Sequence, residues 1–129
     1  MTPTPCHVKH DPPNTYGDCL RACIATLLDL DTAKVPHFAH DGPTDDVVVL
    51  TRLRVFLRGR GLLPFSATYG GTMDEVLNLM ATVNRDVTYL LFNSGHVVVC
   101  RNDEVLHDPA WVPVKMDGSV WSVMVLVKA

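Results

Sequence analysis

Long apolar runs, an excess of positive charge and a leading apolar segment are all missing from this chain. Its longest apolar stretches, such as residues 123–127, are far shorter than the about 20 residues that span a bilayer as a helix. Eleven Lys and Arg stand against 14 Asp and Glu, a formal net charge of −3, whereas binding a phosphate backbone requires a basic surface. The first residues have no apolar core of the kind found in a secretion signal. We therefore expect a cytoplasmic protein whose partners include neither a membrane nor a nucleic acid.

The cysteine spacing typical of redox motifs and zinc fingers is also missing, because no two of the four cysteines are arranged Cys-x-x-Cys. Without a secretion signal, a thiol or metal role is favoured over a disulfide framework. A zinc site remains an alternative if the N-terminal residues fold back onto the following segment. Its potential ligands are Cys6, His7, His10, Cys19 and Cys23. Since no pair of them has finger-like spacing, we expect neither a metal nor a cofactor.

The chain has the size and composition of one globular domain, with 129 residues, 47% hydrophobic and 19% charged. Four of its nine prolines fall within residues 1–17, together with Asn14 and Gly17. Because proline interrupts regular structure, this segment is expected to form an extended arm. The prediction is a single domain over residues 1–129 that begins with this arm.

Two helices are predicted in the first half of the chain. After Asp18, a favourable N-cap residue, apolar side chains recur at the i, i+3, i+4, i+7, i+8 spacing of a helix that packs on a core. This helix is expected to end near residues 29–31. A second helix is predicted over residues 45–58 with Thr44 as its cap, although three consecutive valines there also suit a strand.

The second half of the chain changes from helical to strand character. A capping box formed by Thr72 and Glu75 predicts a third helix over residues 73–84. Segments rich in β-branched residues, separated by Asn, Asp and Gly, predict antiparallel strands. The expected extended segments are 62–69, 87–92, 96–101, 104–107 and 120–127. Helices followed by strands indicate an α+β fold.

Cys19 is the first candidate for chemistry, because it begins the first predicted helix. The free N–H groups of a helix's first turn favour an anion and so favour the thiolate, which is the nucleophilic form. Asp18 opposes this unless its carboxylate caps the helix, and a buried structural cysteine is the alternative interpretation. Cys23 and Cys100 fall on apolar stripes and are expected in the core, whereas Cys6 in the arm is expected to be an ordinary exposed thiol.

His96 and Asp108 are the candidates for a base and its orienting acid. If the turn between the two strands is 102–103, both residues lie at the open end of one hairpin. A strict two-residue loop pairs Val97 with Asp108 and sends His96 and Asp108 to opposite faces. A triad therefore requires a bulge or a longer turn in this hairpin. The fallback base is His107, which alternation places on the other face.

Three segments, read together, resemble small papain-like cysteine-peptidase-fold proteins found in phage and bacterial genomes. The segments are GDCLRACIATLLDL at residues 17–30, VPHF at 35–38 and GHVVVCRNDEVLHDP at 95–109. Their order is a cysteine on a helix, a histidine on a strand and an acid after the next strand. This is the order of papain-like and bacteriocin-processing peptidases, and the resemblance implies a papain-like α+β fold.

The resemblance also implies roles and a reaction. Cys19 corresponds to the nucleophile, His96 to the general base and acid, and Asp108 to the residue that orients the histidine. The implied function is a cysteine hydrolase of peptide, isopeptide or related amide bonds, with a peptide or protein as substrate. The alternative is a non-catalytic binding protein on the same fold, for example a phage-encoded inhibitor of a host protein.

One element of the family pattern is missing. Papain-like enzymes place a glutamine side chain shortly before the cysteine to stabilise the oxyanion, and this chain contains no glutamine. The nearest amide side chain is Asn14, which becomes the oxyanion candidate beside the backbone N–H of Cys19. Loss of one such donor typically costs about 10²- to 10³-fold in rate. The missing glutamine therefore favours the binding-protein alternative, whereas the intact Cys, His and Asp favour the enzyme.

The walls of the cleft are expected to come from two loops, residues 32–43 and 109–119. Trp111 and Trp121 are both expected in the core. Because Trp111 lies three residues from Asp108, the alternative is that it forms part of the cleft wall.

Overall fold

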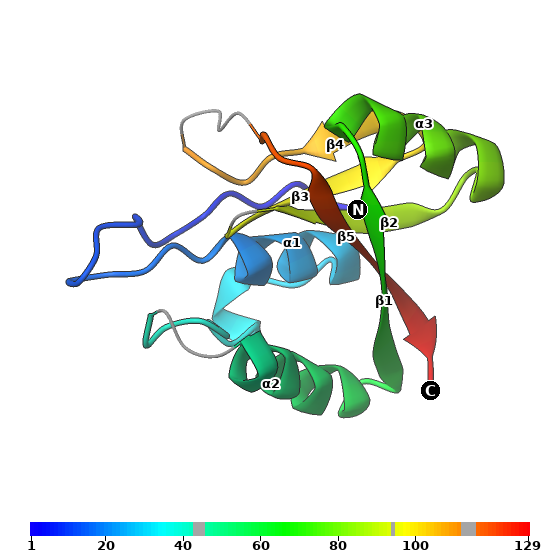
Figure 1. The fold of residues 1–129 in the computed structure, drawn as a ribbon. Coiled ribbons are helices and arrows are strands. Elements are labelled where there is room, and N and C mark those ends of the chain that lie inside the picture. Colours follow the sequence, from blue (N-terminus) through cyan, green and yellow to red (C-terminus); the bar gives the residue numbers. More distant parts are fainter. Residues whose placement is uncertain (43–45, 94, 112–115) are drawn as a thin grey trace.

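A computed structural model of the protein describes residues 1–42, 46–93, 95–111 and 116–129. Its helices and strands form three layers, with a sheet between α1 and α2 on one side and α3 on the other (Figure 1). The helices are α1 (Cys19–Leu28), α2 (Asp46–Arg58) and α3 (Met73–Val83), with a short 3₁₀ helix, η1 (Thr32–Lys34). The strands are β1 (Leu62–Gly70), β2 (Thr88–Asn93), β3 (His96–Arg101), β4 (Glu104–His107) and β5 (Val120–Lys128).

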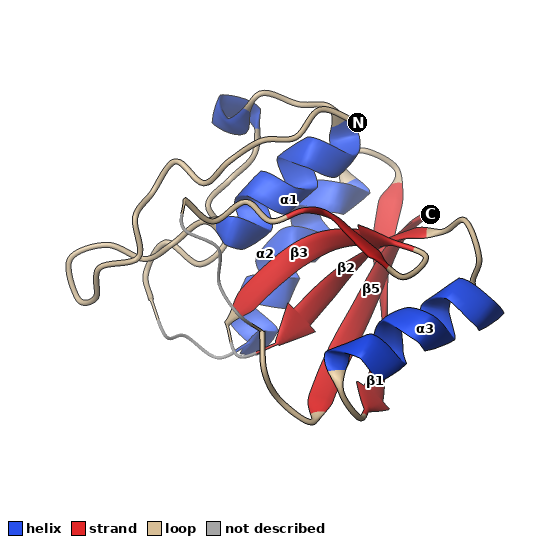
Figure 2. Cartoon of the chain, turned by 90° about the horizontal axis from the view of Figure 1, so that it is seen from above, coloured by secondary structure: helices blue, strands red, loops and turns tan. Residues whose placement is uncertain are grey.

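The five strands form one antiparallel sheet in the order β1-β5-β2-β3-β4 (Figure 2). The C-terminal strand β5 inserts between β1 and β2 and so joins the middle of the chain to its end. The α+β class predicted from the sequence is confirmed. Among the described residues, no helix has the length and apolar character needed to cross a bilayer.

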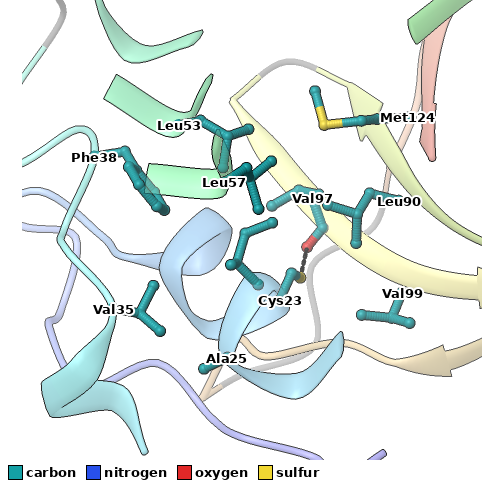
Figure 3. Close-up of a cluster of buried hydrophobic side chains, with 11 residues drawn as sticks. Cys23, Ala25, Val35, Phe38, Leu53, Leu57, Leu90, Val97, Val99 and Met124 are labelled. Atoms are coloured by element: carbon teal, nitrogen blue, oxygen red, sulfur yellow. Dashed lines mark hydrogen bonds between the residues drawn. The ribbon is translucent and has the colours of Figure 1, made fainter. Parts of the chain in front are cut away.

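The two faces of the sheet bury two separate clusters of apolar side chains, as the alternation of strand residues requires. On β3, Val97 and Val99 pack toward α1 and α2, whereas Val98 and Cys100 pack toward α3. Figure 3 shows the first cluster, in which side chains from α1, α2 and three strands surround Cys23. This packing holds α1 beside β3, the strand that begins with His96.

Most predicted helix boundaries agree with the structure. The third helix begins with the expected capping box, in which Thr72 Oγ1 accepts from Glu75 N–H at 3.2 Å and Glu75 Oε1 accepts from Thr72 N–H at 3.1 Å. The valine-rich segment is helical, as α2. Thr44 and Asp45, predicted to cap and begin that helix, lie outside the described residues.

The N-cap position predicted for Asp18 is confirmed, and its side chain binds the arm rather than the helix. Asp18 occupies the N-cap position of α1, but its carboxylate makes no capping hydrogen bond. Its Oδ1 instead accepts the backbone N–H groups of His7 and Val8, each at 3.0 Å. The side chain therefore ties the arm to the start of α1.

The arm itself, residues 1–17, has no helix or strand beyond a single bridge between Asp11 and Thr15, as predicted. It runs past α1, turns, and returns to the start of that helix (blue in Figure 1). Its first part is held by Thr4 N–H, which donates to Thr26 Oγ1 at 2.9 Å, and by Cys6 N–H, which donates to Pro109 O at 2.8 Å. The arm therefore lies between α1 and the segment that follows β4.

Candidate active site

Cys19 is the first residue of α1 and lines a cavity of about 690 Å³. His96 lines the same cavity from the start of β3, because the core cluster packs α1 against that strand. The predicted helix-start position of Cys19 is thus confirmed. A helix leaves the N–H groups of its first turn without intrahelical partners, and they favour a negative charge on a residue at this position.

His96 and Asp108 are in direct contact. The Nε2 of His96 lies 2.8 Å from Asp108 Oδ1, and Ala110 N–H donates to the same carboxylate oxygen at 3.0 Å. The hairpin contains the irregularity that this contact requires. Arg101 pairs with Glu104 and Cys100 pairs with Val105. The register shifts between Cys100 and Val99, so that Val99 pairs with His107. This shift moves Asp108 to the face of His96.

The thiol of Cys19 and the imidazole of His96 perturb each other in opposite directions. Because Asp108 occupies Nε2 of His96, Nδ1 is the ring nitrogen left to face the sulfur. A hydrogen bond with Cys19 is the main cause that raises the pKa of His96, with a smaller contribution from Asp108. These interactions favour a thiolate–imidazolium pair, the reactive form of a cysteine nucleophile.

A second sulfur lies beside the first. Cys6 Sγ is 3.3 Å from Cys19 Sγ, and Cys6 is only 6% exposed. The prediction that Cys6 is an ordinary exposed thiol is therefore wrong, because the arm folds back onto α1 and buries it. The hydrogen bond from Cys6 is the largest cause that lowers the pKa of Cys19 to about 5, against the opposing effect of burial, and His96 adds to the lowering. The same contact, together with burial, raises the pKa of Cys6, so Cys6 is the thiol that keeps its proton.

Asp18 is the buried charge that holds this arrangement. Besides the two arm N–H groups, its carboxylate has an ion-pair partner in Arg21, whose Nη1 lies 3.8 Å from Oδ2. Arg21 in turn donates to the carbonyl oxygens of Thr32 and Val35. The carboxylate of Asp18 thus binds the arm and Arg21, and its charge also contributes to raising the pKa of Cys6.

Asn14, the oxyanion candidate from the sequence, is not brought to the cavity. It lies in the turn at the outer end of the arm, where its N–H donates to Asp11 O, and it is exposed and is not among the residues that line the cavity. His10 lines the cavity instead. Its Nδ1 accepts the backbone N–H of Gly17 at 3.2 Å. Since a backbone N–H can only donate, the neutral His10 ring carries its proton on Nε2 and is a hydrogen-bond donor there.

The loop before α2 closes another side of the cavity through Ala39 and Gly42. The ring of Tyr16 lies so close to Gly42 that a Cβ there would clash with it, and the φ of +88° also favours glycine. The Nε2 of His37 lies 2.7 Å from Tyr16 O. These contacts fix the chain just before Cys19, and they confirm that the described part of the 32–43 loop contributes to the wall.

The remaining candidates divide between core and cleft. Cys23, Cys100 and Trp121 are buried in the core, as predicted, and burial raises the pKa of Cys100 to about 12.

Trp111 is not in the core: it is 57% exposed and lines the cavity, and its Nε1–H donates to Cys6 O. Ala110 of the predicted 109–119 wall also lines the cavity, whereas residues 116–119 do not, and residues 112–115 lie outside the described residues. His107 contacts Thr4 O through Nε2 at 2.8 Å and so anchors the arm.

The zinc alternative is not supported by the geometry. The fold brings Cys6 and Cys19 together, but Cys23 points into the core, where its thiol lies 3.6 Å from Val97 O (Figure 3). Within the described ranges, no three Cys, His, Asp or Glu side chains are grouped so that they could hold one metal ion.

Comparison with known proteins adds no assignment. No protein-family model matches the chain, and neither a curated protein nor a solved structure matches it.

Proposed function

We propose that this protein is a papain-like cysteine hydrolase that cleaves peptide, isopeptide or related amide bonds. The observation that carries the proposal is a chain of contacts that begins at the cavity, which Cys19 and His96 line, and continues to Asp108. Cys19 at a helix N-terminus interacts with His96, whose other ring nitrogen is held at 2.8 Å by Asp108. A nucleophile, a base and an orienting acid in this order have the geometry of a catalytic triad.

The reaction follows from these roles. The Cys19 thiolate attacks the carbonyl carbon of the substrate and forms a tetrahedral oxyanion. His96, as imidazolium, gives its proton to the leaving amine as the C–N bond breaks, and an acyl thioester remains on Cys19. His96 then takes a proton from water, which attacks the thioester and releases the acid. Asp108 keeps the imidazole oriented and stabilises its positive charge.

His10 fits the role of the missing glutamine. An oxyanion needs donors aimed at it, and the free backbone N–H of Cys19 supplies one. The Nε2–H of His10, in the same cavity, supplies a second. We propose that these two groups form the oxyanion hole.

His10→Ala is expected to lower kcat by about 10²- to 10³-fold, the usual cost of one oxyanion donor. The rate of Cys19 alkylation by iodoacetamide is expected to change little, because alkylation forms no oxyanion. The matched control is Asn14→Ala, which removes an exposed amide of the same arm and is expected to keep kcat. The reverse result, with Asn14 required and His10 dispensable, would return the role to Asn14.

The cavity also indicates the kind of acyl group it accepts. Val8, Tyr16 and Trp111 present apolar surface beside Cys19, and His10 and Lys9 add polar groups at the arm. We propose that the acyl side of the substrate carries an apolar residue next to the cleaved bond.

Trapping the acyl-enzyme tests the proposed function. Brief reaction with p-nitrophenyl acetate is expected to acetylate Cys19, and limiting iodoacetamide at neutral pH is expected to label Cys19 before the other three cysteines. Peptide mass spectrometry identifies both products. An unreactive Cys19 in the folded protein would reject the hydrolase and favour the binding protein, the alternative that the absent glutamine supports.

A further inference from the structure

The contact between Cys6 and Cys19 has no part in amide hydrolysis, which needs one sulfur. The two Sγ atoms are 3.3 Å apart, and an S–S bond is about 2.05 Å long, so bonding needs an approach of only about 1.3 Å. Both residues line the cavity, which gives small oxidants access to them. Cys23 and Cys100 are completely buried in the core on either face of the sheet.

Several hydrogen bonds fix the position of Cys6. Its N–H donates to Pro109 O, its carbonyl accepts from Trp111 Nε1–H, and the next two N–H groups donate to the buried Asp18. These bonds hold the backbone on both sides of Cys6. They leave its side chain directed at Cys19, thirteen residues away in the sequence.

We propose that Cys6 and Cys19 form a reversible oxidation site, in which a disulfide between them protects the Cys19 sulfur from irreversible oxidation. The oxidant is a hydroperoxide. The Cys19 thiolate attacks one peroxide oxygen, the O–O bond breaks, and Cys19 becomes a sulfenic acid as the peroxide is reduced to water or an alcohol. The Cys6 sulfur then attacks the sulfenic sulfur, the S–S bond forms, and water leaves with the Cys6 proton. A dithiol reductant restores both thiols and is itself oxidised.

The consequence for catalysis rests on the proposed function, because a Cys19 sulfur bound to Cys6 cannot attack a carbonyl. The disulfide would therefore switch the hydrolase off until a thiol reduces it. The two sulfurs also have different tasks. Cys19, whose pKa is lowered, reacts with the peroxide, and Cys6, which carries the proton, then attacks the sulfenic acid and loses that proton to the departing water.

The test treats the reduced, full-length protein with hydrogen peroxide and follows Cys19 by peptide mass spectrometry. In the wild type we expect a linked Cys6–Cys19 peptide, loss of Cys19 alkylation, and full recovery of alkylation after dithiothreitol. Cys6→Ser keeps a hydrogen-bond donor but cannot form the bond, so its Cys19 is expected to proceed to sulfinic and sulfonic acids that dithiothreitol does not reverse. Each variant is compared with its own untreated sample, and Cys6→Ala provides a second variant if the serine form does not fold.

Cys100→Ala is the matched control, since it removes a buried thiol on the opposite face and is expected to leave the linked peptide unchanged. Irreversible oxidation of wild-type Cys19 without a linked peptide, or a link to Cys23 instead, would overturn the proposal. The two proposals fail separately. A linked peptide without acetylation of Cys19 rejects only the hydrolase, whereas acetylation without a linked peptide rejects only the oxidation site.

Discussion

Cys19→Ala is expected to lower turnover by on the order of 10⁶-fold, because loss of the nucleophile removes the covalent route altogether. Cys19→Ser is expected to be similarly inactive, since a hydroxyl beside His96 lacks the lowered pKa of the thiol. Cys19 is half-buried at the first turn of α1, so neither change should unfold the protein. The measurements are hydrolysis of peptidyl aminomethylcoumarins and p-nitrophenyl acetate, together with thermal unfolding.

Cys23→Ala is the matched control for this result. Cys23 lies one turn further along the same helix, but its thiol is in the core beside Val97. Its replacement is expected to reduce thermal stability and to leave the chemistry of the cavity intact. Full hydrolysis by folded Cys19→Ala protein would show that another group is the nucleophile.

His96→Ala is expected to lower kcat by about 10²- to 10⁴-fold, the usual contribution of general acid–base catalysis. It is also expected to change the pH dependence of Cys19 alkylation. The thiolate forms above the thiol's pKa, and Cys6 and His96 together lower the pKa of Cys19 to about 5 from its ordinary 9.0. Loss of His96 removes both its hydrogen bond to Cys19 and its positive charge, each of which lowers the pKa of Cys19. The alkylation midpoint should therefore rise.

Two substitutions of Asp108 distinguish its role in orienting the His96 ring from the role of its negative charge. Asp108→Ala removes the acceptor of both His96 Nε2 and Ala110 N–H and is expected to lower kcat strongly, though less than loss of His96. Asp108→Asn keeps an oxygen that can accept both bonds and is expected to retain more activity than alanine.

An alkylation midpoint unchanged by His96→Ala would contradict the thiolate–imidazolium pair.

Local patterns predicted much of the fold because they depend on neighbours along the chain. The capping box of Thr72 and Glu75, the apolar spacing after Asp18 and the β-branched segments all report interactions within a few residues. The alternation of side chains along the strands also predicted a feature that links two strands. It showed that His96 and Asp108 can meet only across an irregular hairpin, and the register shift near Val99 provides it.

The arm could not be predicted in the same way, because nothing within it specifies where it lies. Cys6 comes to Cys19 through bonds to residues distant in the sequence, such as Pro109 and Trp111. The same return path places His10 at the cavity and leaves Asn14 outside it. The sequence spacing of His10 and Gly17 does not predict the hydrogen bond between them.

The sequence by itself determined the α+β class, the helix that begins at Cys19 and the hairpin that carries His96 and Asp108. Those features follow from backbone preferences and apolar periodicity, which operate over a few residues. Only the tertiary structure decided the environment of Cys19. A second sulfur, the ring of His10 in the cavity wall and an Asp18 that binds the arm all depend on long-range packing, which no local spacing records. For that reason the environment of the Cys19 sulfur depends on a segment that the sequence predicts only as an extended arm.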